Sequence, residues 1–212
     1  MPRVSFAQAT TELAKRDPVM RRFIKRVGPF RLAKSRDDHF TALVESILYQ
    51  QLAGAAAAAI HRRFIALFDG HLTPEALLAA PDEAIRGAGV SGNKATSMRD
   101  LATKVLDGTV PLENIQRLRD EAVIERLITV RGIGRWTAEM FLIFQLRRMD
   151  VWPVDDYGVR KGFALIYGLR ELPKPKELHT LGERFKPYRT PAAWYCWRAV
   201  DTILPGTNSG RA

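Results

Sequence analysis

Two adjacent carboxylates, Asp155 and Asp156, stand in an aromatic-flanked turn that leads into a helix. An Asp at this position commonly caps the helix, and two of them permit two roles. We expect Asp155 to be the cap and Asp156 to face a cleft, where the helix dipole favours the ionised form. A carboxylate placed there can stabilise an oxocarbenium-like sugar, or activate the attacking water, while an N-glycosidic bond breaks.

Upstream of that turn, a Gly-Ile-Gly segment joins two apolar helical stretches. Gly132 and Gly134 allow a sharp turn that exposes backbone N–H groups, and Ile133 is expected to pack inward. The next helix presents its positive end at the same place. Side chains with positive charge or a hydroxyl flank the turn: Arg131, Arg135 and Thr137. The pattern predicts a phosphate site, and an ordinary turn between helices is the alternative.

The elements that position these residues are helices throughout. Apolar residues recur at helical spacing along nearly the whole chain, and no convincing strand alternation occurs. We therefore predict an all-α fold, a single domain over residues 1–212 with two helical lobes and a cleft between them. One lobe is expected at 37–115. The other combines 1–36 with 116–205 and includes a helix-hairpin-helix at 121–146.

The charge balance favours a polyanionic partner. The chain has 33 basic and 23 acidic side chains, a net charge of +10 and a pI near 10.1. One cysteine, Cys196, excludes an internal disulfide, and four scattered histidines show no zinc-ligand spacing. No long apolar run or signal peptide is evident. From the residues alone we expect an intracellular protein whose partner is nucleic acid or an anionic membrane surface, and a basic but inert surface is the alternative.

Five motifs together resemble the helix-hairpin-helix DNA glycosylase superfamily, specifically its 3-methyladenine DNA glycosylase II family, over residues 37–200. They are Leu-Tyr-Gln-Gln-Leu (48–52), Gly-Val-Ser-Gly-Asn-Lys (89–94), Val-Arg-Gly-Ile-Gly-Arg-Trp-Thr-Ala (130–138), Asp-Asp-Tyr (155–157) and Lys-Pro-Tyr-Arg (186–189). The resemblance implies a cytoplasmic or nuclear monomer that binds double-stranded DNA and no membrane, and it places Asp156 at the catalytic position. It implies further that Gln51 fills the gap left by a flipped base.

The same resemblance assigns the remaining DNA contacts. It implies that the hairpin from Val130 to Gly134, together with Thr137, anchors a DNA phosphate. A monovalent cation at the backbone of Val130 and Ile133 often accompanies such a hairpin. Further DNA contacts are implied at Leu52, Ser91 and Lys94. From the residues alone, Ser91 is expected to cap a helix, and Lys94 at that helix start to have a phosphate or carboxylate partner.

One substitution bears on the type of reaction. Relatives that also cut the DNA strand carry a Schiff-base lysine directly after the hairpin, where this chain has Trp136. The cysteine ligands of the iron–sulfur branch are absent too. The resemblance therefore implies a monofunctional glycosylase of base excision repair, without a cofactor or lyase activity, which leaves an abasic site.

Aromatic residues are expected to bind the damaged base. An alkylated purine is cationic, so stacking and cation–π attraction favour it. The candidate pocket residues are Trp136, Met140, Tyr157 and Trp197, with Trp152 nearby. Core packing is the alternative for Trp152 and Trp194. Relatives often have a Tyr where Met140 stands, so other lesions (ethenoadenine, hypoxanthine or a mismatched base) remain alternatives. A non-catalytic module that binds damaged DNA is a further one.

Overall fold

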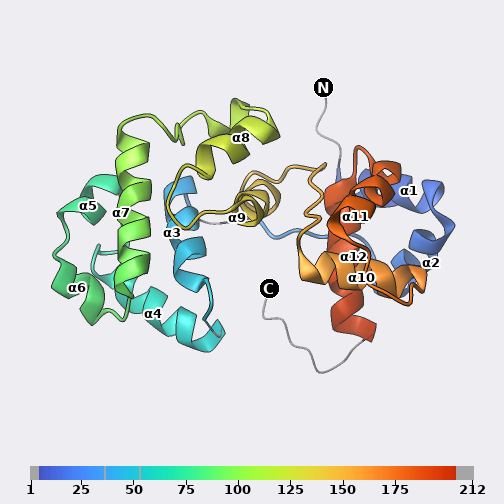
Figure 1. Ribbon diagram of the computed structural model, residues 1–212, viewed down its shortest axis with the longest axis horizontal. Helices are drawn as coiled ribbons and strands as arrows, with labels where there is room; N and C mark the ends of the chain where they lie inside the picture. Colours follow the sequence, from blue (N-terminus) through green and yellow to red (C-terminus); the bar gives the residue numbers. More distant parts are fainter. Residues whose placement is uncertain (1–4, 36, 53, 204–212) are drawn as a thin grey trace. The chain divides into compact units, whose positions relative to one another are not determined.

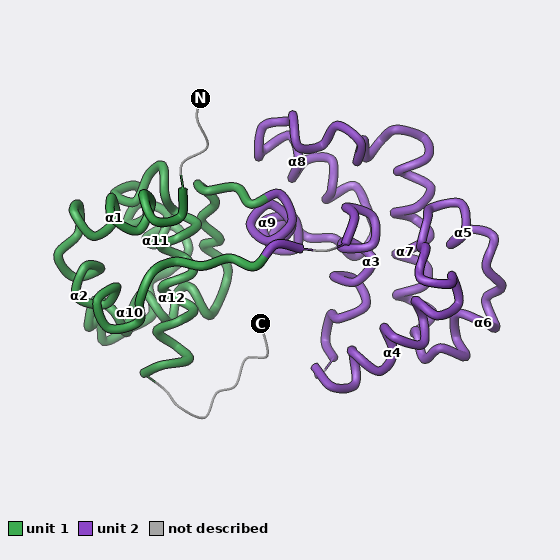
Figure 2. Tube along the Cα trace, turned by 180° about the vertical axis from the view of Figure 1, so that it is seen from behind, with its two compact units in different colours: residues 1–33, 147–212 green, residues 34–146 purple. Residues whose placement is uncertain are grey.

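The computed structural model describes residues 5–35, 37–52 and 54–203, and every regular element among them is helical (Figure 1). The chain divides into two compact units (Figure 2). Unit 1 combines Met1–Ala33 with Arg147–Ala212, and unit 2 is Lys34–Leu146. The predicted all-α fold is thereby confirmed. None of the helices in the described part is long and apolar enough to cross a membrane.

The boundary between the units differs from the one expected. Residues 116–146, expected in the other lobe, belong to the same unit as residues 34–115. Hydrogen bonds explain the difference. Lys104 Nζ donates to the Thr129 carbonyl at 2.6 Å, and the Arg131 N–H donates to Asp100 Oδ2 at 2.7 Å. Both contacts hold the hairpin to the long helix of unit 2.

Unit 2 is built around α7 (Gly92–Leu106), which buries Met98 and Leu101 completely. Ser91 is its N-cap, as predicted, and accepts a hydrogen bond from the Lys94 N–H. The other elements are α3 (His39–Tyr49), α4 (Gly54–Ala66), α5 (Pro74–Ala79), α6 (Asp82–Gly87), the 3-10 helix η1 (Ile115–Arg117), α8 (Asp120–Leu127), α9 (Arg135–Met140) and the π-helix η2 (Phe141–Gln145). The predicted helix-hairpin-helix is thus α8, the turn and α9.

The π-helix η2 was not foreseen. The Leu146 N–H donates to the Phe141 carbonyl at 3.0 Å, five residues back, where an α-helix would bond four residues back. Short π-helical turns occur often near functional sites. The apolar pattern cannot reveal this feature because the same residues would bury a face of either helix type.

Unit 1 contains α1 (Phe6–Arg16), α2 (Pro18–Val27), α10 (Tyr157–Tyr167), α11 (Pro175–Gly182), the 3-10 helix η3 (Glu183–Phe185) and α12 (Arg189–Ile203). The first two begin at residues whose types favour helix starts. Ser5 and Gln8 form a capping box, and Asp17 Oδ1 accepts from two amides of α2, whose first residue is Pro18. These caps fix where the helices begin.

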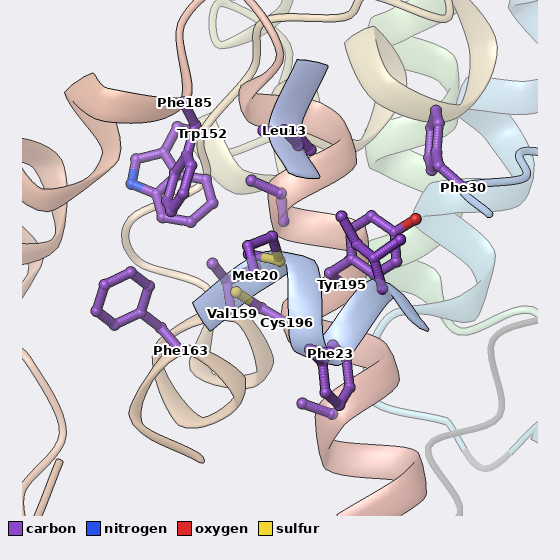
Figure 3. Close-up of a cluster of buried hydrophobic side chains, with 14 of the residues drawn as sticks. Leu13, Met20, Phe23, Phe30, Trp152, Val159, Phe163, Phe185, Tyr195 and Cys196 are labelled. Carbon is purple, nitrogen blue, oxygen red and sulfur yellow. The ribbon is translucent and has the colours of Figure 1, made fainter. Parts of the chain in front are cut away.

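The core of unit 1 gathers around α12 (Figure 3). Cys196 lies beside Met20 and Val159, and all three are fully buried. α10 and α12 meet closely at Gly162, where a Cβ atom would stand 1.8 Å from the Cys196 carbonyl oxygen. Trp152 is 6% exposed and donates its indole N–H to the Leu178 carbonyl, so it is a core residue and not a pocket residue.

Candidate active site

The carboxylate of Asp156 is buried at the start of α10. Asp156 is the N-cap, and its Oδ1 accepts a 2.8 Å hydrogen bond from the Val159 N–H. Asp155 lies in the preceding turn and is exposed. The expected division of roles was therefore wrong. The helix begins at Tyr157, so only Asp156 can reach the amide three residues ahead. The acid expected to do chemistry is also the cap.

A second donor reaches the same oxygen from α12. The Trp197 indole Nε1 lies 2.9 Å from Asp156 Oδ1. Gly158 makes room for this contact, because a Cβ there would stand 2.8 Å from Trp197 Cδ1 and 3.1 Å from Asp156 Oδ1. Two N–H groups from different helices thus fix one carboxylate, and Asp156 is only 6% exposed. These two donors hold the carboxylate in one orientation.

The neighbouring thiol stays neutral. Burial first, and then the charge of Asp156, raises the pKa of Cys196 well above its usual range. Cys196 is completely buried, so it acts as a small apolar neighbour of the carboxylate and not as a nucleophile.

The four predicted pocket residues are divided between the units. Trp197 and Tyr157 belong to unit 1, where Trp197 is half-buried and Tyr157 is 65% exposed. Trp136 and Met140 lie one turn apart on α9 in unit 2, half-buried and buried respectively. Trp197 donates its indole N–H to Asp156 Oδ1. Selection of the base by these four residues stays a prediction.

The hairpin of unit 2 has the predicted sharp turn. Gly132 has φ +78°, a conformation that favours glycine. A Cβ there would also stand 2.8 Å from Ser97 Oγ on α7, so any larger residue would crowd that side chain. Ile133 is 4% exposed and packs inward as expected. The Arg131 side chain is exposed, whereas its N–H is already bonded to Asp100.

One expected phosphate ligand of the hairpin, Arg135, is paired within the protein, and another, Thr137, is buried. Arg135 forms a two-pronged ion pair with Glu121 at 2.8 and 3.0 Å, and a further one with Glu139 at 3.2 Å. Its hydrogen bond with Glu121 raises the pKa of Arg135 and lowers that of Glu121. Thr137 is 5% exposed. Phosphate contact by these two residues stays a prediction; in the structure the Arg135 charge is balanced by two glutamates and Thr137 is buried.

A monovalent cation at the hairpin remains a prediction. The Val130 carbonyl accepts a 3.1 Å hydrogen bond from the Ile133 N–H. A carbonyl oxygen has two lone pairs, so that bond leaves one for a cation. Among the described residues, no cluster of His, Cys, Asp or Glu offers a site for a metal ion.

The remaining predicted DNA contacts come together in unit 2. Gln51, Leu52, Ser91 and Lys94 all border one hollow of ≈ 210 Å³. Gln51 is exposed and has φ +56°, a left-handed conformation that is uncommon outside glycine. The partners of Lys94 differ from the expected phosphate or carboxylate. Its Nζ donates to the carbonyls of Leu48 at 2.7 Å and Gln50 at 2.8 Å.

Sequence reasoning also missed residues that hold these segments. Gln50 Nε2 donates to the Gly132 carbonyl at 2.9 Å, and Asp100 pairs with Lys104 at 2.7 Å. The Asp100–Lys104 ion pair could have been predicted from the sequence, because oppositely charged residues four apart on a helix commonly pair. The Gln50 contact joins segments 82 residues apart and has no signal in the sequence.

The chain is similar to known proteins in both sequence and fold. Residues 44–187 match the model of the HhH-GPD superfamily of base excision DNA repair proteins. The chain is 36% identical to DNA-3-methyladenine glycosylase 1 of Schizosaccharomyces pombe over 92% of this chain and 87% of that protein.

Two solved structures have the same fold. The S. pombe 3-methyladenine DNA glycosylase in complex with abasic DNA has a TM-score of 0.81 at 35% identity, covering 92% of this chain and 97% of that one. The DNA-3-methyladenine glycosidase of Bacillus halodurans has a TM-score of 0.85 at 37% identity, covering 92% and 90%. The chain belongs to the HhH-GPD superfamily of base excision DNA repair proteins.

Proposed function

We propose that this protein is a DNA glycosylase that removes alkylated purines of the 3-methyladenine and 7-methylguanine type from double-stranded DNA. It hydrolyses the N-glycosidic bond and leaves an abasic site. The observation that carries the proposal is the buried Asp156 carboxylate, fixed by the Val159 amide and the Trp197 indole. Relatives named 3-methyladenine glycosylases, one of them solved with abasic DNA, support the choice of substrate. An enzyme acting on genomic DNA works in the nucleoid or the nucleus.

The reaction needs a fixed negative charge more than a strong acid. An alkylated purine is already cationic, so the electron pair of the breaking bond neutralises the departing base. The sugar is left positively charged, and the Asp156 carboxylate stabilises that charge in the transition state. Water then adds to the sugar carbon, and the carboxylate orients it and accepts its proton. The two N–H donors hold the carboxylate in place before the bond breaks, so little reorganisation is needed.

DNA binding is divided between two segments of unit 2. The exposed Gln51 is proposed to fill the gap left by the flipped base, with Leu52 beside it. The hairpin from Val130 to Gly134 is proposed to contact the backbone through its glycine-rich turn and the exposed Arg131. Such contacts do not read sequence. The net charge of +10 adds attraction for any duplex.

The reaction stops at the abasic site. Trp136 follows the hairpin where a Schiff-base lysine would be needed, so no amine is placed there to attack the sugar. Its indole face instead suits a cationic base, at about 0.5–2 kcal/mol per contact.

A panel of lesions in otherwise identical duplexes tests the proposal. Each duplex is scored for free base and, separately, for strand cleavage without added alkali. We expect release of 3-methyladenine and 7-methylguanine with intact strands until alkali is added. Release of only ethenoadenine, hypoxanthine or a mismatched base would move the enzyme to another substrate class. Binding to damaged DNA with no released base would indicate a non-catalytic module.

A further inference from the structure

One face of α7 supports both segments that the proposed function assigns to DNA. Lys94, Ser97, Asp100 and Lys104 follow each other at spacings of three and four, so they line the same side of the helix. Lys94 contacts the turn at 48–52, and the other three contact the hairpin at 129–134. The two segments lie far apart in the sequence, and both contact this face of α7.

At the turn, Lys94 holds the end of α3. The last carbonyls of a helix have no partner within it. The Lys94 ammonium supplies one to Leu48 at 2.7 Å and to Gln50 at 2.8 Å. Those carbonyls lie on either side of the point where the chain leaves the helix and enters Gln51. Gln51 then adopts φ +56°, so its exposed side chain depends on a backbone held from outside.

At the hairpin, the support is equally direct. Asp100 Oδ2 accepts from the Arg131 N–H at 2.7 Å, and Lys104 Nζ donates to both Asp100 and the Thr129 carbonyl. Gln50 links the two segments, because its Nε2 donates to the Gly132 carbonyl. The backbone around Gln51 is therefore fixed on one side by Lys94 and on the other by the hairpin.

We propose that Lys94 is a positioning residue, which sets the backbone of the turn so that Gln51 can enter the DNA. The proposal rests on the proposed function, since it concerns how the same site grips DNA. Two of the three N–H donors of the ammonium are directed at carbonyls, and burial lowers the pKa of Lys94. The alternative role for Lys94 is a direct contact with a DNA phosphate. In that case its removal would reduce the dependence of DNA affinity on salt concentration.

The test uses the full-length protein and a duplex containing one abasic site, to which binding needs no catalysis. Affinity is measured across a range of salt concentrations for wild type, Lys94→Met, Gln51→Ala and the double variant. We expect Lys94→Met to weaken binding by about tenfold, the loss expected from hydrogen bonds of a charged group. The salt dependence should match that of wild type. The double variant should bind no more weakly than the weaker single variant, because both changes disable the same contact.

Two further variants serve as controls. Lys15→Met removes one exposed charge from α1 and shows the effect of net charge alone. Lys94→Gln keeps an amide donor that can reach one carbonyl, so it should recover part of the lost affinity while carrying no charge. If Lys94→Met does not fold, Lys94→Gln is compared with wild type directly: its affinity and its salt dependence then provide the test.

Two results would overturn the proposal. The first is a salt slope reduced by about 0.9 in Lys94→Met and equally in Lys94→Gln, as expected for one lost phosphate contact. The second is full additivity of Lys94→Met and Gln51→Ala. Base release by wild type is measured in parallel. Its absence would refute the proposed glycosylase activity and leave the binding result for Lys94 unaffected.

Discussion

The indole Nε1 of Trp197 lies 2.9 Å from Oδ1 of Asp156, the oxygen that also accepts the Val159 N–H at 2.8 Å. One oxygen is thus held by the helix that begins at Tyr157 and by a neighbouring helix. The capping bond fixes the position of the carboxylate along α10. The indole bond fixes its direction toward α12. Each bond can be removed separately.

Replacing Trp197 by Phe removes the indole N–H and keeps an aromatic ring. We expect single-turnover base release to slow by about 10- to 100-fold, because a hydrogen bond to a charged group contributes about 1.5–3 kcal/mol. Trp194→Phe is the matched control, since Trp194 lies on the same helix and packs edge-on against Phe30. A rate equal to wild type in Trp197→Phe would show that the indole contact does not serve the reaction.

Gly158→Ala tests the space between the two residues. Its new Cβ would lie 2.8 Å from Trp197 Cδ1, so the indole or the start of α10 must shift. We expect base release to fall at least tenfold, because small displacements of a positioned group are costly. Gly87→Ala, whose Cβ would meet nothing within 4 Å, is the control. Crystal structures of both variants would show whether the Trp197–Asp156 distance lengthens. Base release by Gly158→Ala at the wild-type rate would contradict the required geometry.

Asp100→Asn tests how the hairpin is held. Burial alone would raise the pKa of Asp100, but hydrogen bonds from Lys104 and from the Arg131 N–H outweigh it and lower the pKa below 3.8. A depressed carboxyl pKa contributes stability that is fully present above the unfolded value and is lost as pH falls through the folded value. Wild type should therefore unfold at a higher temperature than Asp100→Asn at pH 7.

That difference in Tm should shrink as the pH is lowered below about 4, where the unfolded carboxyl is protonated. Asp107→Asn is the control, because it removes a different carboxylate at the end of the same helix. Asp107 Oδ1 accepts a hydrogen bond from the Thr109 N–H, which lies outside the hairpin at 129–134. A constant difference between wild type and Asp100→Asn down to pH 2 would rule out the ionised Asp100 as its source.

Much of the fold follows from local chemistry. Ser5, Asp17 and Ser91 cap helices as their residue types predict, because each cap is a contact across three residues. The sharp Gly132 turn follows from the same local logic. The boundary between the units could not be predicted in this way, because it depends on hydrogen bonds between α7 and the hairpin that no sequence pattern reveals.

The candidate site could be found in part. The resemblance singled out Asp156, but the sequence could not separate it from Asp155, because either acid fits a cap and one residue decides where the helix begins. Arg135 was expected to meet a phosphate, and Lys94 a phosphate or a carboxylate. Their partners, Glu121 and two carbonyls, lie well away along the chain, so only the structure reveals them.

The most direct measurement is single-turnover release of 3-methyladenine from duplex DNA by wild type, Asp156→Asn and Asp155→Asn. Asn at 156 can still cap α10 and accept the Trp197 N–H, so the fold and the Tm should persist. We predict that Asp156→Asn slows release by about 10²–10⁴-fold and that the exposed Asp155→Asn stays near wild type. Equal rates for Asp156→Asn and wild type would contradict the role of Asp156.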